Sequence, residues 1–211
     1  ALSVLQNTFG YQSFRPGQED VVSHLLAGRH VLAVMPTVAG KSLCFQVPAL
    51  VRGGLTLVVS PLVALMEDQV AALKLAGVDA ETLNSSRSYE DNVAIWRRVA
   101  AGQVNLLYLS PERLMTPRML AALQQLPIRL IAVDEAHCIS QWGPAFRPDY
   151  ESLAQLRDLF PGVPIAALTA TADQVTRQDI ATRLFGGDGD VIVAGFDRPN
   201  IRLSVEMKSG G

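Results

Sequence analysis

Short apolar runs alternate with amphipathic stretches along nearly all of this 211-residue chain, and this alternation restricts the fold more than any other feature. Each run has the length of a buried strand and is too short for a helix. The expected strands are residues 31–35, 55–59, 104–109, 130–133, 165–168 and 191–194. Strands that alternate with helices favour a mostly parallel sheet with helices on both faces. The predicted fold class is therefore α/β.

Helical spacing is clearest between the second and third strands. Steps of three and four residues separate the apolar positions Leu62, Leu65, Met66, Val70 and Leu73. Such steps place all of them on one face of a helix, and the preceding proline suits a helix start. Further helices are expected over about residues 17–27, 41–51, 88–101, 117–126, 150–160 and 173–185.

Composition indicates one globular domain. An apolar content of 49% and a mean hydropathy of +0.22 predict a substantial buried core. No apolar run approaches the roughly 18 residues that span a bilayer, and the first residues lack a signal-peptide pattern. We therefore expect a cytoplasmic protein with no membrane partner. The domain is expected over residues 1–195, and residues 196–211 are interpreted as a linker leading out of it.

The cysteine content and the net charge exclude further classes of protein. Cys44 and Cys138 are too few for a disulfide framework and lack the paired spacing of a zinc site, so both are expected to be reduced thiols. A net charge of −2 and a pI near 5.9 argue against a surface that binds nucleic acid everywhere. Any DNA site must be local.

The first strand is followed by the sequence Pro-Thr-Val-Ala-Gly-Lys-Ser and then a helix, which is the order of a phosphate-binding loop. Gly40, Lys41 and Ser42 match that motif. Lys41 would reach the β and γ phosphates, and the Ser42 hydroxyl would bind Mg²⁺. The strict motif also requires a glycine where this chain has Met35. Taken alone, the segment is explained better by an ordinary strand-to-helix turn with a surface lysine.

A second motif changes that balance. Asp134 and Glu135 directly follow the strand at 130–133, so their carboxylates are expected at the carboxyl edge of the sheet, where ligands of open α/β folds bind. Asp134 could hold Mg²⁺ through water. Glu135 could orient and deprotonate an attacking water. The competing interpretation of this pair is a solvated turn.

Taken together, these motifs resemble the first RecA-like lobe of a RecQ-type helicase of superfamily 2, and the resemblance covers nearly the whole chain. It implies a P-loop NTPase domain that binds ATP and Mg²⁺. The segment 14–18 is similar to the family's adenine-recognising segment, which implies nucleotide contacts for Arg15 and Gln18, as the phosphate loop does for Thr37. His137 completes the family's carboxylate motif. Thr169 and Thr171 lie in the segment that links nucleotide state to movement between lobes.

The resemblance also implies a DNA surface. The segments 60–69 and 110–114 resemble those that grip the DNA backbone, which implies contacts for Ser60 and Gln69. The aromatic-rich segment 138–150 is the most family-specific. Trp142 and Phe146 offer flat faces for unpaired bases, and Arg147 could bind a phosphate. We hypothesise that this loop couples DNA binding to ATP hydrolysis; alternatively, its aromatic side chains fill a small core beneath the loop.

Two positions depart from the family's pattern. Val38 stands where relatives commonly have glycine, and a β-branched residue is strained by roughly 1 to 3 kcal/mol where φ is positive. Nucleotide affinity would then fall by about one or two orders of magnitude. In the aromatic loop, Pro144 and Ala145 replace two polar residues of many relatives, which weakens the case for coupling more than the case for DNA contact.

The leading hypothesis is the motor lobe of an ATP-dependent 3′–5′ DNA helicase that acts in repair or recombination on single strands and duplex junctions. It would need a second RecA-like lobe, which in related motors supplies arginines to the transition state, so this lobe alone should hydrolyse ATP slowly. The runner-up is a nucleotide-blind DNA-binding or scaffold module with a degenerate phosphate loop. A small-substrate P-loop kinase is disfavoured because no arginine-rich lid segment is present.

Overall fold

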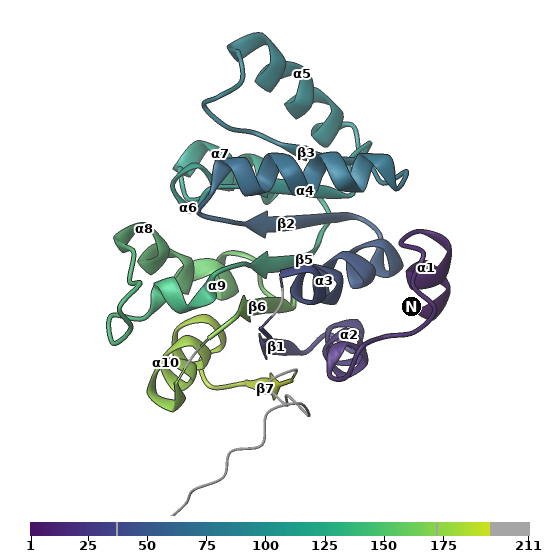
Figure 1. Cartoon of the computed structure of the whole chain (residues 1–211). Coiled ribbons are helices and arrows are strands. Elements are labelled where there is room, and N and C mark those ends of the chain that lie inside the picture. The colour runs from purple at the N-terminus through teal and green to yellow at the C-terminus, as the bar shows by residue number, and fades with distance from the viewer. Residues whose placement is uncertain (37, 172, 195–211) are drawn as a thin grey trace, which may run out of the picture.

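Seven parallel strands form a single sheet in a computed structural model of the chain, which describes residues 1–36, 38–171 and 173–194. Their order across the sheet is β3-β4-β2-β5-β6-β1-β7, stacked from top to bottom in Figure 1. The strands are β1 (His30–Val34), β2 (Leu55–Val59), β3 (Ala80–Thr82), β4 (Leu106–Leu109), β5 (Ile128–Val133), β6 (Ile165–Thr169) and β7 (Gly189–Val193). The predicted parallel α/β sheet is confirmed.

Each strand sends alternate side chains to opposite faces, so the sheet has two cores. In β1, Leu32 and Val34 enter one apolar cluster, while Val31 and Ala33 enter the other. All four are buried, which explains why the strands appear in the sequence as continuous apolar runs.

Helices cover both faces. On the face of Val31 lie α2 (Gln18–Leu26), α3 (Val38–Arg52) and α4 (Val63–Leu75). The face of Leu32 is covered by α5 (Tyr89–Ala100), α6 (Pro111–Leu114), α7 (Pro117–Leu123), α8 (Pro148–Glu151), α9 (Leu156–Leu159) and α10 (Gln174–Phe185), with the short 3₁₀ turns η1 (Ala136–Ile139) and η2 (Ser152–Gln155). The N-terminal α1 (Leu2–Asn7) packs Leu5 against α3.

The structure differs from the predicted elements at several places. Strand β3 was not predicted, because three residues with a glutamate in the middle give no apolar run. The single helix expected over 150–160 is instead α8, η2 and α9 in succession. Helix α3 begins at Val38 rather than at residue 41, and α4 begins at Val63 with Leu62 as its N-cap. Strand β7 begins at Gly189, two residues before the expected start at residue 191.

Both cysteines are buried free thiols, as predicted. Within the described part of the chain, no helix is long and apolar enough to cross a membrane. The proposed linker, residues 196–211, lies outside the described residues.

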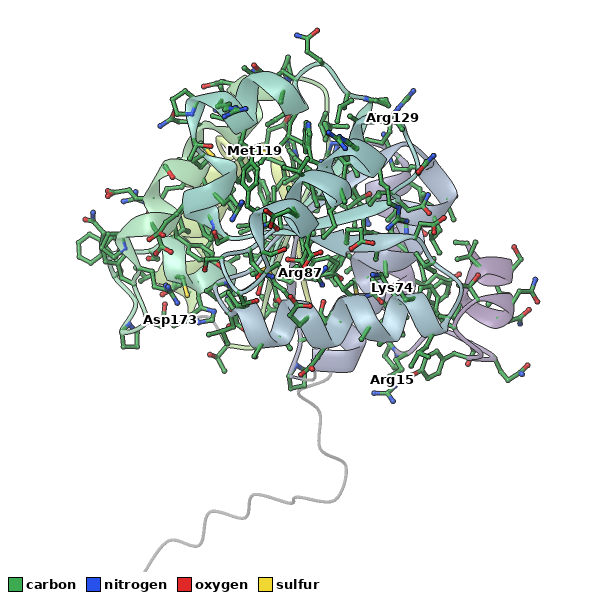
Figure 2. The ribbon with its side chains drawn as sticks, turned by 90° about the horizontal axis from the view of Figure 1, so that it is seen from above. Arg15, Lys74, Arg87, Met119, Arg129 and Asp173 are labelled. Carbon is green, nitrogen blue, oxygen red and sulfur yellow. The ribbon has the colours of Figure 1, made fainter. Side chains whose placement is uncertain are left out.

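A buried glutamate ties the edge strand β3 to the helices on both sides of it. The Glu81 side chain is 3% exposed, and Lys74 Nζ of α4 lies 3.1 Å from its Oε1. Arg98 of α5 contacts the same oxygen, and Arg87 lies 3.7 Å from Oε2. Figure 2 labels Lys74 and Arg87 near α4. A buried carboxylate is tolerated only with such partners, and an inward-pointing charge on an edge strand also discourages pairing with another strand.

Glu81→Gln should therefore lower the free energy of unfolding by about 2 kcal/mol, because three cations lose a buried partner. Urea denaturation of both proteins measures the difference. Asp79→Asn is the control: Asp79 is 66% exposed and 3.8 Å from Arg98, so its loss should change little. Equal stability of the Glu81→Gln variant and the parent chain would contradict this account.

Candidate nucleotide and DNA site

The carboxyl ends of the central strands bring the predicted nucleotide residues to one edge of the sheet. Asp134 follows β5, and its N–H donates to Val59 O at the end of β2, at 2.9 Å. On the other side of β5, Thr169 ends β6, and its carbonyl accepts from Met35 N–H after β1 at 3.0 Å. Because all the strands are parallel, these segments and the start of α3 meet at the same edge.

Asp134 is held firmly in a buried position. It is 6% exposed, its Oδ1 accepts from Glu135 N–H at 2.9 Å, and its carbonyl accepts from the Tyr150 hydroxyl at 2.8 Å. Burial raises the pKa of Asp134, while the charge of Lys41 opposes that rise. A buried carboxylate with a raised pKa is a site where a cation would be favoured.

Glu135 has an unusual backbone conformation. Its φ of 52° and ψ of 42° make it the one non-glycine residue with positive φ in the described part of the chain. That conformation costs about 1 to 2 kcal/mol for an L-residue, so the surrounding hydrogen bonds must impose it. Besides the bonds at Asp134, Cys138 N–H donates to Glu135 O at 2.9 Å. The turn separates the two adjacent carboxylates: Asp134 is buried, whereas the Glu135 side chain is 27% exposed.

A chain of hydrogen bonds joins the carboxylate turn to the end of β6. His137 Nδ1 lies 2.8 Å from Thr169 Oγ1, and that hydroxyl donates to Thr171 O at 3.0 Å. Since the Thr169 proton is used there, its oxygen accepts from His137 Nδ1–H. His137 Nε2 then faces Glu135 Oε2 at 3.5 Å. Burial lowers the pKa of His137, and the Glu135 carboxylate partly opposes that fall.

Lys41 is 2% exposed and forms no ion pair with any described residue. Its charge nevertheless acts on the pKa values of both Asp134 and His137, so its ammonium group lies near them. A buried ammonium without an anionic partner is costly. It lies in the first turn of α3, where backbone N–H groups also favour an anion.

Gln18 connects segment 14–18, which resembles the adenine-recognising segment, to the phosphate loop. It is 2% exposed, its Oε1 accepts from Arg15 N–H at 2.7 Å, and its Nε2 donates to Gly40 O at 3.0 Å. One donor and one acceptor site of the amide are therefore used within the protein. Thr37 lies outside the described residues, as do the side chains of Val38 and Ala39.

The predicted aromatic loop presents a large exposed surface. Trp142 is 75% exposed, which contradicts the alternative that it fills a core, whereas Phe146 and Arg147 are partly buried. The Arg147 guanidinium pairs with Asp149 at 3.3 Å. Arg147 N–H donates to Cys138 O at 2.9 Å, which closes the loop onto the carboxylate turn.

The two other predicted DNA residues are placed differently from each other. Ser60 lies at the carboxyl edge but is 2% exposed, and its Oγ has no partner. Gln69 lies further along α4 and lines a cavity of about 540 Å³ with Tyr11, Ser42 and Gln46. The structure thus groups Gln69 with a predicted nucleotide residue rather than with the aromatic loop.

Sequence reasoning did not assign a role to Tyr150, which is fully buried and bonded to the Asp134 carbonyl. It lies at the end of the aromatic segment, so it joins that segment to the carboxylate turn. The sequence shows that Tyr150 is close to the aromatic loop. It does not indicate the hydrogen bond from the Tyr150 hydroxyl to the Asp134 carbonyl.

Comparison with known proteins identifies the family. A family model described as DEAD/DEAH box helicase matches residues 15–180. The chain belongs to the DEAD/DEAH box helicase family. It is 50% identical over 208 residues to the ATP-dependent DNA helicase RecQ of Haemophilus influenzae, covering 99% of this chain and 34% of that protein. It is 49% identical to the RecQ of Pasteurella multocida, covering 99% of this chain and 33% of that protein.

The chain therefore spans about a third of the length of these relatives, which agrees with a single lobe of a longer motor, and the RecQ resemblance is confirmed. Among solved structures, the Pyrococcus furiosus Hef helicase domain matches with a TM-score of 0.65 at 18% identity, covering 87% of this chain and 39% of that one. That likeness supports the RecA-like fold.

The His137 environment predicts a measurable titration. Because burial lowers its pKa, the ring should stay neutral at pH values just below the ordinary 6.5. The unfolded chain then binds more protons below pH 6.5, so this group makes stability fall as pH falls. In an NMR titration, Glu135→Gln should lower the His137 pKa further, since it removes the opposing carboxylate. A higher pKa in that variant would contradict the geometry.

Proposed function

We propose that this chain is the ATP-binding motor lobe of a 3′–5′ DNA helicase that acts in DNA repair or recombination together with a second RecA-like lobe. One observation carries the proposal: Lys41, in the first turn of α3, is buried beside Asp134 and forms no ion pair with any residue that the structure describes. A nucleoside triphosphate supplies the missing negative charge.

The residues at this edge suit a magnesium–nucleotide complex. The Ser42 hydroxyl and the Asp134 carboxylate are hard oxygen ligands of the kind Mg²⁺ prefers, and burial raises the pKa of Asp134, so a cation beside it would be favoured. Held there by Ser42 and Asp134, Mg²⁺ would supply positive charge that offsets the charge of the phosphates. Lys41 and the first N–H groups of α3 would hold the phosphates. Gln18, tied to Gly40, would fix the position of the adenine-recognising segment relative to the phosphate loop.

Glu135 is the group best placed to activate water. Its carboxylate is accessible, and it lies 3.5 Å from the His137 ring. From there it would orient a water and accept its proton. His137, Thr169 and Thr171 form a continuous path from that carboxylate to the end of β6, so a change at the γ phosphate would reach the segment after β6.

DNA contact would act on the same turn. Arg147 N–H and the Tyr150 hydroxyl bind the carbonyls of Cys138 and Asp134, so both ends of the contact between loop and turn are fixed by hydrogen bonds. A base stacked on Trp142 would therefore bias the position of Glu135. This geometry supports coupling of DNA binding to hydrolysis despite Pro144 and Ala145.

The second candidate is a nucleotide-blind DNA-binding or scaffold module. The observation in its favour is Val38 at the first position of α3, where the resemblance implies a glycine. Its side chain would then exclude the phosphates that Lys41 otherwise attracts.

Calorimetric titration with Mg·ATP separates the two candidates. Val38 is helical, so its backbone is not in the positive-φ region and the expected backbone strain is not found there. We expect micromolar to millimolar binding that strengthens by roughly tenfold or more in Val38→Gly, because glycine has no side chain to exclude the phosphates. Lys41→Ala in the Val38→Gly background should abolish it, because the phosphates lose their ammonium partner. Binding that is absent in both the parent chain and Val38→Gly would overturn the nucleotide proposal.

The proposed DNA contact predicts that a change in the aromatic loop lowers the affinity for single-stranded DNA. Trp142→Ala should weaken binding of single-stranded DNA by roughly 5- to 100-fold, the range expected when one base loses its stacking partner. Leu75→Ala serves as the control, since Leu75 is 91% exposed and lies at the end of α4. The 211-residue chain should not unwind a duplex, because the second lobe is required. Unchanged DNA affinity in Trp142→Ala, or unwinding by this chain, would contradict the proposal.

A further inference from the structure

A second basic and aromatic surface lies on the flank of the lobe, between α5 and α7. A cavity of about 580 Å³ opens there, lined among others by Tyr89, Trp96, Arg97, Arg113, Arg118 and Met119. It lies on the face of the sheet opposite α4, where Figure 2 labels Met119 of α7. Of the segments assigned above to nucleotide or DNA binding, only 110–114 contributes to it, through Arg113.

The three arginines of this cavity have no ion-pair partner among the described residues, and no carboxylate lines it. Other arginines nearby are paired: Arg87 with Glu67 at 2.7 Å, and Arg98 with Asp79 at 3.8 Å and with the buried Glu81. In a chain with a net charge of −2, three unpaired guanidinium groups around one cavity are a local anion-binding surface.

The cavity also offers surface for a flat ring. Tyr89 is 79% exposed at the first position of α5, and Trp96 lies two turns further along the same helix with its ring packed partly against the core. Leu83, Val93 and Met119 add apolar surface. A ligand that carries both aromatic rings and regularly spaced negative charges fits this combination.

Arg113 connects the cavity to the carboxyl edge of the sheet. It also lines a smaller cavity of about 280 Å³ with Val63, Asn84 and Ser110. That second cavity lies between the first residue of α4 and the N-cap of α6, within the segments that resemble the family's DNA-gripping elements. A DNA strand bound at the carboxyl edge of the sheet would therefore reach the α5–α7 cavity next.

We propose that the α5–α7 cavity is an auxiliary single-stranded DNA site: one unpaired base stacks on Tyr89 over the apolar wall, and Arg97, Arg113 and Arg118 bind the flanking phosphates. The inference rests on the proposed DNA-binding function and extends the strand path beyond the aromatic loop. An acidic peptide with an aromatic residue would match the same charges, but the connection through Arg113 to the edge favours the nucleic acid.

Fluorescence anisotropy of the 211-residue chain with oligothymidylates of two lengths tests the proposed path of the DNA strand. An oligomer of about 8 nucleotides reaches only one site, whereas one of about 20 spans both. Tyr89→Ala and Arg118→Ala should each weaken binding of the longer oligomer by roughly fivefold and leave the shorter one unchanged. Arg118→Ala should also reduce the salt slope for the longer oligomer by roughly 0.7, the value for one phosphate contact.

Matched controls separate the role of each group. Tyr89→Phe keeps the ring and should bind like the parent chain. Arg129→Ala removes the same charge at an exposed arginine outside the cavity and should leave the salt slope unchanged. Thermal melts of all variants identify any that are misfolded, and Tyr89→Phe remains informative because it is a conservative change.

The outcomes distinguish this inference from the proposed function. If Trp142→Ala weakens both oligomers while Tyr89→Ala and Arg118→Ala bind the longer one normally, the auxiliary site is refuted and the DNA function stands. If only Tyr89→Ala and Arg118→Ala have an effect, the auxiliary site stands and the role of Trp142 is refuted. Absence of DNA binding by the parent chain refutes both. An acidic, Phe-containing peptide that binds the parent chain but not Arg118→Ala, with DNA binding unaffected by either variant, assigns the cavity to a protein partner instead.

Discussion

The hydrogen bonds that hold the turn after β5 determine the rest of the candidate site. Asp134 is buried and its carbonyl accepts from Tyr150, while its carboxylate accepts from the next N–H, so Glu135 is forced into a left-handed conformation. Two adjacent carboxylates thereby reach different surroundings. One is desolvated beside Lys41, where a cation is favoured, and the other is accessible beside His137, where a water can be bound.

The same turn is where the other functional segments meet. His137 connects it to Thr169 and Thr171 after β6, and Arg147 and Tyr150 connect it to the aromatic loop. In the proposed function, nucleotide and DNA would therefore act on the same turn. Among the described residues Lys41 has no ion-pair partner, which favours an anionic ligand in the proposed site. The same argument applies to Arg97, Arg113 and Arg118 on the flank of the lobe.

Much of the fold followed from the sequence because buried parallel strands produce apolar runs that local pattern reveals. Strand β3 could not be found in this way, since Glu81 is buried only through Lys74, Arg87 and Arg98, which lie apart in the sequence. The left-handed Glu135 and the role of Tyr150 depend on hydrogen bonds between segments that no local pattern encodes. The clustering of Lys41, Asp134 and His137 was predictable from the carboxyl-edge rule, whereas the arginine cluster of the α5–α7 cavity depended on how the helices pack.

We propose that the start of α3 and the turn after β5 together bind one nucleotide. Hydrogen–deuterium exchange of the 211-residue chain with and without millimolar Mg·ATP analogue tests it directly. We predict that exchange slows jointly at residues 38–44 and 134–138, because phosphate binding orders the first turn of α3 and the metal-facing turn at the same time. Slowing in only one of the two segments, or in neither, would contradict a shared site.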